Sequence, residues 1–484
     1  MADTGMFAWT DGARLEARLD AEFYQSHFLA AEKRLGRVPV QRFHKLWRDS
    51  NRIYIGIAGF TERSEDRSYT PYIRPTDVGP NGEIDWDRIA WCYSEWLDDY
   101  AGSGCAKAGD LLVEVKGNTR RAAVVDGEVP SNCIVSGSFW RLSLVDSVNP
   151  RFILAYLLSD TGQLLKRRWV SNSVISWIDP HSFRRFQIPV PDRRVQDFIG
   201  AKVELAERCR AVAAEEQARL NEDLDALYRG CPYDTQPTLC TQVSPGELEG
   251  VRLDAWYHQR HFIALADWLR KNRNFIQLGH VAKLSAERWS PSKHRHDSFS
   301  YIEIANVDPA TGHVSYSEVP TEKAPSRARK LVRAFDVLVS TVRPNRGAVG
   351  LVPDSLDTAV ATSGFAVARA KNKQDAFFLL AVLRHPASTA QLMRFNTGSA
   401  YPAIEEGVVL QVWIPGAKQE IRATLGAREL RRTALLQRGA SLVTEAKANV
   451  EALIDGDLDV DAILAGTLKA PTADDIPELA EDAG

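Results

Sequence analysis

The sequence RLDAEFYQSHF at residues 18–28 recurs as RLDAWYHQRHF at residues 252–262, with seven of the eleven positions identical. Downstream, the correspondence settles to a constant shift of 226 residues. The pairs that follow this shift include Asp110 with Asp336, Phe139 with Phe365, Phe152 with Phe378, Leu154 with Leu380, Ser173 with Ser399, Ile178 with Ile404, Pro189 with Pro415, Leu227 with Leu453 and Gly230 with Gly456. A period this long indicates a duplicated domain, because solenoid repeats are about 20–45 residues long.

Each copy has the same predicted order of elements. An amphipathic helix opens the copy at residues 19–35 and 253–269. Short strands and turns follow, and then a β-hairpin at residues 110–125 and 336–351, where two alternating apolar runs flank a polar tip. An apolar helix comes next, around residues 152–158 and 377–383, before a proline stop at 188–191 and 414–415.

A long, charged, helix-favouring run ends each copy, at residues 195–228 and 421–454. Ala206, Ala213, Leu220 and Leu227 recur every seven residues in the first run, and Leu435, Leu442 and Val450 belong to a similar stripe in the second. Helices of this length extend for about 50 Å. Because a narrow apolar seam needs a partner helix, we expect the two helices to pack together, antiparallel and related by a pseudo-twofold axis.

The predicted fold is therefore α/β (α+β), with two repeated domains joined by two long antiparallel, coiled-coil-like helices. The first domain spans residues 1–191 and its long helix residues 192–230. A linker at 231–250 leads to the second domain at 251–416 and the second long helix at 417–456. Residues 457–484 form an acidic tail that we expect to be disordered.

Composition places the chain among ordinary globular proteins of the cytoplasm. It is 44% hydrophobic and 25% charged, and its apolar runs are far shorter than the ~20 residues of a membrane span. The N-terminus has no signal-peptide pattern. The six cysteines show no paired spacing, which is typical of free thiols in a reducing compartment.

The net charge of −3 averages over unlike segments. From Asp455 to the end there are nine acidic residues and one lysine, which leaves +5 on residues 1–454. Residues 271–350 carry thirteen Lys or Arg against seven Asp or Glu. The acidic end therefore masks a basic body that could bind nucleic-acid phosphates.

Several motifs, in order and twice over, resemble the specificity subunit of type I restriction-modification enzymes, across residues 15–456. Besides RLDA, they are YIEIANV at 301–307, DVLVSTVRP at 336–344, TSGF at 362–365 and GSAYPAI at 398–404. The first copy departs from the pattern, with GNTR at 117–120 in place of RPNR and SVIS at 173–176 in place of SAYP.

This resemblance implies two target-recognition domains, one for each half of a split double-stranded DNA target, with spacing on the order of one DNA turn. It also implies a helical scaffold that docks two adenine-N6 methyltransferase subunits and, in complete systems, a nuclease-translocase subunit. It implies no catalytic site, no cofactor and no membrane contact. The system could equally be a related methylation-based defence system.

Basic residues at the hairpin tips and in nearby basic runs are the candidate DNA contacts. A two-stranded ribbon fits the major groove, where Arg binds guanine bidentately, and basic runs suit phosphate contacts. A solvated charged surface is the plainer alternative for each. The candidates at the tips are Lys116, Arg120, Arg121, Arg343 and Arg346; Tyr401 comes from the GSAYPAI motif; those in runs expected to be loops are Lys166, Arg167, Arg168, Lys293, Arg295, Arg327, Arg329 and Lys330.

Two other functions remain open from the sequence. The run Asp110, Glu114 and Lys116 resembles the metal-binding strand of many nucleases and could hold Mg²⁺, although the second copy has Ser340 and Val342 at the last two positions. Alternatively, the paired helices could scaffold partners without binding DNA.

Other catalytic and metal patterns are weaker. Residues 149–152, Asn-Pro-Arg-Phe, only half resemble the adenine-gripping element of a methyltransferase and lack a glycine-rich cofactor loop upstream. His294 and His296 have no Cys or acidic partner at ligand spacing, so we predict no metal site. His27 and His261 share a repeat position and are expected to be packed or capping residues.

Overall fold

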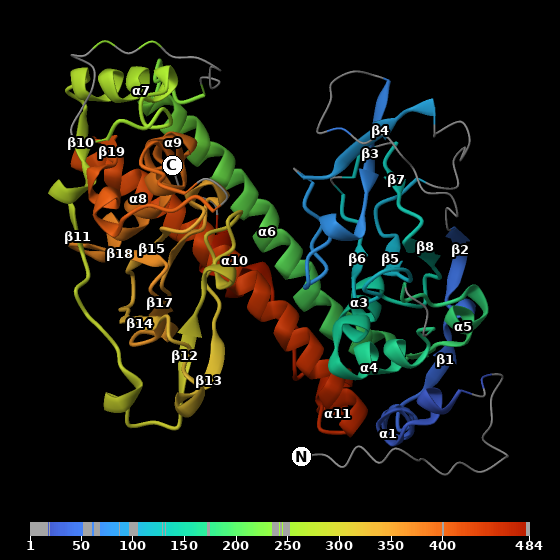
Figure 1. The fold of residues 1–484 in the computed structure, drawn as a ribbon. Coiled ribbons are helices and arrows are strands. Elements are labelled where there is room, and N and C mark those ends of the chain that lie inside the picture. Colours follow the sequence, from blue (N-terminus) through green and yellow to red (C-terminus); the bar gives the residue numbers. More distant parts are fainter. Residues whose placement is uncertain are drawn as a thin grey trace. The chain divides into compact units, whose positions relative to one another are not determined.

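A computed structural model describes residues 18–480 except 19, 52–60, 62–67, 87, 96–104, 128, 131, 172–174, 235–241, 243, 245–251 and 399–400. The chain divides into two compact units (Figure 1). Unit 1 comprises Met1–Ala211 and Leu436–Gly484, and unit 2 comprises Val212–Leu435. Both unit boundaries fall inside long helices, so each unit contains a segment of α6 and a segment of α10.

The described elements of unit 1 run in the order η2 (Ala21–Tyr24), α1 (Ser26–Leu35), β1 (Val40–Arg42), β2 (Trp47–Asn51), β3 (Tyr69–Ile73), β4 (Ala90–Tyr93), β5 (Leu111–Glu114), β6 (Ala122–Val124), β7 (Ile134–Val135), β8 (Phe139–Leu144), α3 (Pro150–Leu158), α4 (Asp160–Arg168), α5 (Pro180–Arg185), β9 (Gln187–Pro189) and the first part of α6 (Arg193–Leu227). The last part of α10 and α11 (Val460–Leu464) complete the unit.

Those of unit 2 are the rest of α6, α7 (Arg260–Lys271), β10 (Phe275–Gln277), β11 (Ala282–Leu284), β12 (Ser298–Ile302), β13 (Ser317–Pro320), β14 (Ala328–Leu331), β15 (Val337–Ser340), β16 (Val349–Leu351), β17 (Val360–Thr362), β18 (Phe365–Ala370), α8 (Lys373–Arg384), α9 (Pro386–Arg394), β19 (Trp413–Pro415) and the first part of α10 (Gln419–Asp455). Short 3-10 turns lie between several of these elements.

The two units repeat one sheet topology, as the repeated sequence predicted. The main sheet has the order β2-β8-β5-β6 in unit 1 and β11-β18-β15-β16 in unit 2. A smaller sheet, β4-β3-β7 or β13-β12-β17-β14, contains one parallel pair in each unit. Each unit also has a two-stranded pair, β1-β9 or β10-β19. The predicted proline stop begins inside β9 in unit 1 and lies inside β19 in unit 2.

Both predicted hairpins are confirmed, as β5-β6 and β15-β16. All four strands are buried along their whole length because the main sheet is covered on both faces. In unit 2, Val337 and Val339 belong to a core cluster that includes α8, whereas Leu338 between them packs in a cluster with residues of the smaller sheet. The two predicted apolar helices are α3 and α8, and their apolar segments, 152–158 and 377–383, are buried throughout.

The repeated RLDA motif forms the same local lock in each unit. The Arg18 guanidinium pairs with Asp20 at 2.7 Å and donates to the carbonyl groups of Trp169 and Val170. Arg252 pairs with Asp254 and donates to the carbonyl groups of Phe395 and Asn396, the repeat equivalents of residues 169 and 170. The motif therefore fastens the start of each copy to the chain that follows α4 or α9.

This lock explains why the opening helices are shorter than predicted. Gln25 is extended (ψ 142°), so α1 begins at Ser26 after a 3-10 turn. Asp254 accepts the backbone N–H of Tyr257, and α7 begins at Arg260. The predicted starts at residues 19 and 253 are wrong because these side chains bind neighbouring backbone groups outside a helix.

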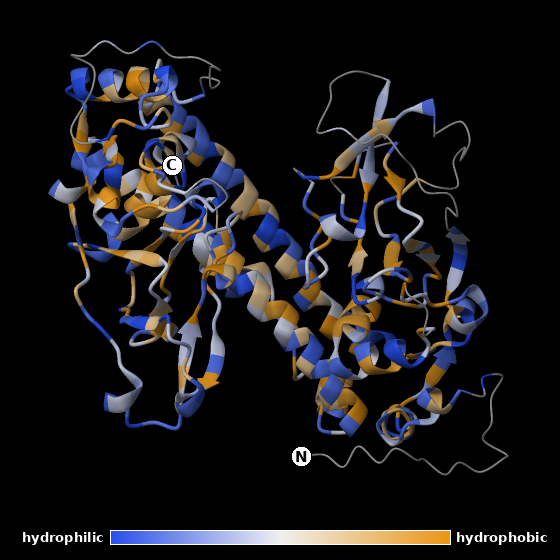
Figure 2. Ribbon diagram, viewed as in Figure 1, coloured by the Kyte–Doolittle hydropathy of each residue, from blue (hydrophilic) through white to orange (hydrophobic). Residues whose placement is uncertain are grey.

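The long helices are confirmed within one to two residues at each end, and their segments run antiparallel inside each unit (Figure 2 colours them by hydropathy). In unit 1, Lys202 of α6 donates to Asn449 of α10 at 2.6 Å, and Ala206 of α6 lies beside Gly439 of α10. In unit 2, Arg431 pairs with Glu216 at 2.9 Å and Arg428 with Asp223 at 3.0 Å. Residue numbers therefore rise along one helix as they fall along the other. None of the described helices is long and apolar enough to cross a membrane.

The predicted disorder of residues 457–484 is wrong for the part that the structure describes. Residues 457–480 contain α11 and two 3-10 turns, and Ile463, Ile476 and Leu479 are buried. Arg194 of α6 donates to the carbonyl of Leu464 at 3.0 Å. Three buried apolar side chains hold the acidic segment in unit 1. Most of the predicted linker lies outside the described residues, but Cys231 and Tyr233 pack against the cluster that contains Tyr228.

Candidate nucleic-acid interface

The hairpin tip of unit 1, residues 115–121, is shaped by one buried carboxylate. Glu114, 2% exposed, accepts backbone N–H groups from Asn118, Arg120 and Arg121 at 3.0–3.1 Å. The backbone reverses through Gly117 (φ 105°) and Thr119 (φ 55°). Lys116 and Arg120 are exposed and Arg121 is half-buried, so this tip presents basic side chains as predicted.

Helix α4 supports the same tip from the other side. Gln163 Nε2 donates to the Arg120 carbonyl at 2.9 Å, and Lys166 Nζ lies 3.4 Å from the Arg121 carbonyl. Lys166 is 2% exposed, and desolvation lowers its pKa to about 7 although the charge of Glu114 raises it. The prediction that Lys166 contacts DNA from a loop is therefore wrong, because it is a buried helical residue.

The two arginines that follow Lys166 differ in exposure. Arg168 is buried, pairs with Glu32 at 2.9 Å and lies 3.9 Å from the centre of the Phe23 ring, so its predicted DNA contact is also wrong. Arg167, in the last turn of α4, is exposed. Of the three basic residues in this run, Arg167 keeps its side chain accessible to a phosphate.

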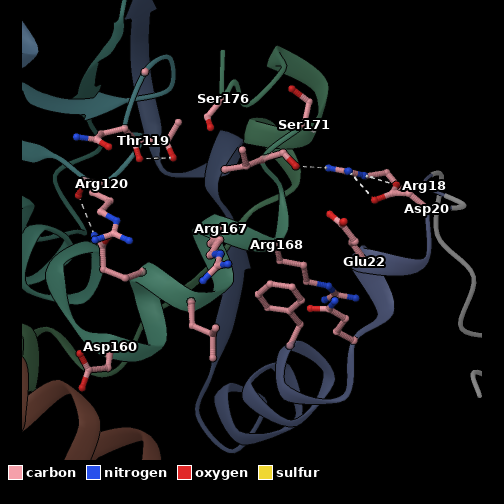
Figure 3. Close-up of a pocket in the computed structure, with 17 residues that line it drawn as sticks. Arg18, Asp20, Glu22, Thr119, Arg120, Asp160, Arg167, Arg168, Ser171 and Ser176 are labelled. Atoms are coloured by element: carbon pink, nitrogen blue, oxygen red, sulfur yellow. Dashed lines mark hydrogen bonds and ion pairs between the residues drawn. The ribbon is translucent and has the colours of Figure 1, made fainter. Parts of the chain in front are cut away.

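A cavity of ≈ 730 Å³ lies beside this tip in unit 1 (Figure 3). One part of its wall is the tip, Gly117 to Arg120, and another is the outer side of α4 with Gln163 and Arg167. The chain around Arg18, Glu22 and Ser171 completes it. The lining is mainly polar and of mixed charge, which suits a polar or charged ligand better than an apolar one.

Asp110 and Glu114, the two carboxylates of the nuclease-like strand, are each bound by groups of unit 1. Asp110 is bound by Arg141 at 2.9 Å, by Ser143 and by a backbone N–H group, while Glu114 holds the tip. Four residues along an extended strand separate the two α-carbons by about 13 Å. Among the described residues, no three His, Cys, Asp or Glu side chains are grouped to hold a metal ion. Asp110 and Glu114 therefore serve separate structural contacts, and the nuclease alternative finds no support in this strand.

The hairpin tip of unit 2 is built differently. Arg343 is left-handed (φ 52°) and its N–H donates to the Pro402 carbonyl at 2.6 Å. Its guanidinium lies 4.5 Å from the centre of the Tyr401 ring, and Tyr401 is 65% exposed. Arg346 is exposed at the end of the turn. The structure therefore brings together Arg343, Arg346 and Tyr401, which were predicted from separate motifs.

The remaining basic candidates of unit 2 fall into two groups. Lys293, Arg295, Arg327 and Arg329 are exposed, as a phosphate contact requires. Lys330 is 2% exposed, pairs with Glu406 at 2.6 Å and donates to the Phe365 carbonyl, so its predicted DNA contact is wrong. Arg329 and Lys330 lie in β14, where successive side chains point to opposite faces, and not in the predicted loop.

The sequence did not predict a role for two residues at or beside these tips, Ile175 and Gln163. Ile175 is 55% exposed and stands at the repeat position of Tyr401, so each unit exposes one large side chain there. The shift of 226 residues contained the signal for it. Gln163, which binds the tip backbone, had no signal in the sequence because glutamine is common on helix surfaces.

Comparisons with known proteins give structural likenesses alone. No family model matches the chain, and no curated protein matches it. The chain is similar to the HsdS subunit from Thermoanaerobacter tengcongensis, with 19% identity over 87% of this chain and 97% of that one, and a TM-score of 0.28. A chain of a type I R-M system has 17% identity, covers 87% and 99%, and has a TM-score of 0.29.

A third similar structure is the type-I restriction-modification system S subunit from M. genitalium. It is 13% identical over 86% of this chain and 95% of that chain, with a TM-score of 0.42. These likenesses are to the family that the repeated sequence motifs resemble.

Proposed function

We propose that this chain is the non-catalytic, DNA-reading subunit of a restriction-modification or related defence methyltransferase complex. Each unit reads one half of a split double-stranded target through its hairpin tip. Exposed cations near the tips bind phosphates and give affinity, while the tip side chains contact base edges and give specificity.

The observation that carries this proposal is the pair of exposed basic tips at repeat-equivalent places. Arg120 stands on the β5-β6 hairpin and Arg346, its equivalent, on the β15-β16 hairpin. An exposed arginine at the same hairpin position of both units supports a shared binding role for the two tips. Two tips with different neighbouring side chains also fit two different half-sites.

The partners belong to the same proposal. Two adenine-N6 methyltransferase subunits dock on the helical scaffold of α6 and α10, and a nuclease-translocase subunit joins in complete systems. The chain itself supplies no methyl transfer or cleavage. The buried, fully bonded carboxylates at Asp110 and Glu114 support this part of the proposal.

Selection from a duplex library with about 30 random base pairs tests the proposal on the purified full-length chain. We expect an enriched motif of two defined blocks separated by an undefined spacer. Arg343→Ala/Arg346→Ala relaxes one block, and Arg120→Ala/Arg121→Ala relaxes the other, at about 1–3 kcal/mol for each base that the variant no longer reads. A continuous motif, or no enrichment over a bait without protein, overturns it.

Control variants away from the tips separate base reading from general attraction. Lys45→Ala in unit 1 and Arg273→Ala in unit 2 remove exposed cations outside the tips. They should leave both blocks of the motif unchanged. If the chain binds random duplex DNA without any salt dependence, or not at all, it is a protein scaffold, because phosphate contacts release counterions.

A further inference from the structure

The polar backbone groups of Arg120 and Arg121 are all bound within unit 1. Both N–H groups donate to Glu114 at 3.0 Å. The Arg120 carbonyl accepts from Gln163, and the Arg121 carbonyl accepts from the Glu114 N–H at 2.9 Å, with Lys166 Nζ 3.4 Å away. The backbone of these two residues therefore has no spare donor, and any N–H···O bond that they make to DNA must come from their side chains.

The three residues that bind this backbone sit in rigid elements. Glu114 ends β5 in the main sheet, and Gln163 and Lys166 lie one turn apart on α4. Glu114 and Lys166 are both buried, so two ionisable side chains hold the tip from beneath. A tip anchored to a strand and to a helix cannot rotate against either one without breaking several hydrogen bonds.

The conformation that they hold is a costly one. Thr119 has φ 55°, which a β-branched residue rarely adopts, and it is 6% exposed. Left-handed backbone at a non-glycine residue persists when the surroundings fix it, and it concentrates at ligand-binding sites. The backbone N–H groups on both sides of Thr119 donate three hydrogen bonds to Glu114, and these supply that constraint.

Unit 2 has none of these three side chains at the equivalent positions. Ser340, Thr389 and Leu392 replace Glu114, Gln163 and Lys166. The Ser340 hydroxyl donates to the nearby Val342 carbonyl. The unit 2 tip instead depends on proline and on left-handed Arg343 and Gly347. The side-chain clamp is therefore a feature of the first unit.

We infer that Glu114, Gln163 and Lys166 are positioning residues for DNA recognition, which fix the tip of unit 1 so that the Arg120 and Arg121 side chains meet one half-site in a defined orientation. The inference rests on the proposed function. It assigns to a buried carboxylate and a buried lysine an effect on which base pairs are accepted, although neither side chain touches DNA.

The test uses Glu114→Gln and Gln163→Ala in the full-length chain, with binding measured by fluorescence anisotropy on the duplex that the wild-type chain selects. Glu114→Gln keeps the side-chain shape but replaces one carboxylate oxygen by a donor. We expect it to reduce discrimination against substitutions in the unit 1 half-site by about 10-fold, the size of one charged hydrogen bond. Discrimination in the other half should stay within about 2-fold, well below the effect of one hydrogen bond.

A double-mutant cycle distinguishes positioning from loss of fold. In a chain that carries Arg120→Ala/Arg121→Ala, Glu114→Gln should change DNA binding no further, since the side chains that it positions are gone. Thr389→Ala, at the Gln163 position of unit 2, is the matched control and should have no effect. Gln163 is half-exposed, so we expect Gln163→Ala to fold and to keep the test valid if Glu114→Gln does not fold.

The outcomes separate the two proposals. If Arg120→Ala/Arg121→Ala binds and selects DNA like the wild type, the proposed role of the tip fails. If that variant is impaired but both Glu114→Gln and Gln163→Ala discriminate like the wild type, the positioning inference fails. It also fails if Glu114→Gln weakens binding equally with and without the two arginines.

Discussion

The two units solve one packing problem in opposite ways. In unit 2, Arg384 of α8 and Arg432 of α10 share the carboxylate of Glu429, which is 0% exposed. The repeat-equivalent residues of unit 1 are Leu158, Val203 and Ala206, all buried. A fully apolar contact in one copy is thus an ionic cluster in the other, within the same fold.

The ionic cluster of unit 2 binds backbone carbonyl groups of the turn at residues 308–312. Arg384 donates to the Ala310 carbonyl, and Arg432 donates to the Thr311 carbonyl at 2.7 Å. The turn ends at Gly312 (φ 73°), beside the Arg384 side chain. In unit 1 the turn ending at Gly82 (φ 80°) lies against Leu154. Two guanidinium groups bind this turn in unit 2, whereas in unit 1 the side chain of Leu154 lies against its glycine.

Removing the shared carboxylate should have the largest effect on stability. Glu429→Ala leaves two guanidinium groups without their counter-charge in a buried site, and breaking a buried pair costs about 3–5 kcal/mol. We expect lower protection of unit 2, measured by hydrogen exchange with mass spectrometry on α8 and α10 peptides, and unchanged protection of α3 peptides in unit 1.

Val203→Ala, at the equivalent position of unit 1, is the control for this variant. It removes two buried carbons and should cost about 1–3 kcal/mol, localised to unit 1. Equal losses from the two substitutions would show that Glu429 acts through its volume and not through its charge.

The second prediction concerns the pH dependence of stability. It uses a substitution in unit 1 that introduces the residue found at the equivalent position of unit 2. Leu392 is the equivalent of Lys166. Desolvation lowers the pKa of Lys166 from 10.5 to about 7 in the folded chain. Between these values the unfolded chain binds more protons, so this group makes stability rise with pH, by at most about 1.4 kcal/mol per pH unit. Below pH 7 both states are protonated and the slope disappears.

Lys166→Leu should remove that slope. Urea unfolding of both proteins at pH 7, 8 and 9 measures it, and the advantage of the variant should be largest at pH 7 and shrink toward pH 9. Parallel pH profiles for the two proteins would mean that Lys166 is charged in the folded chain.

The architecture could be predicted from the sequence because repeated patterns in the sequence encode it. The shift of 226 residues, the alternating runs at the hairpins and the seven-residue spacing in the long helices each depend on many residues. The role of a single side chain, in contrast, depends on only a few neighbouring residues. Lys166 and Lys330 belong to basic runs that are typical of solvated surfaces, yet each packs one side chain inward beside a carboxylate.

The prediction of a disordered acidic tail was wrong for a related reason. Ile463, Ile476 and Leu479 follow no helical or strand period, and the charge around them is typical of disorder. Their burial depends on a surface elsewhere in unit 1, which no local pattern encodes. The tip clamp was missed because Glu114 in a Glu-x-Lys strand matches a nuclease motif, and the three backbone N–H groups that bind its carboxylate are invisible in sequence.

The smallest net effect is expected when the whole ionic cluster is replaced by its apolar counterpart. The variant Arg384→Leu/Glu429→Val/Arg432→Ala gives unit 2 the residues of unit 1 at these three positions. Desolvation lowers the pKa of Arg384 to about 10, which shows how poorly the site solvates a charge. Replacing a buried ion cluster by apolar residues is often neutral or stabilising. Two hydrogen bonds to the turn carbonyls are removed as well, at about 1 kcal/mol each. These terms oppose each other, so hydrogen-exchange protection of α8 should stay within about 1–2 kcal/mol of the wild type, far above Glu429→Ala. If the triple variant is as unstable as the single one, the guanidinium bonds to the turn, and not the balance of buried charge, hold this part of unit 2 together.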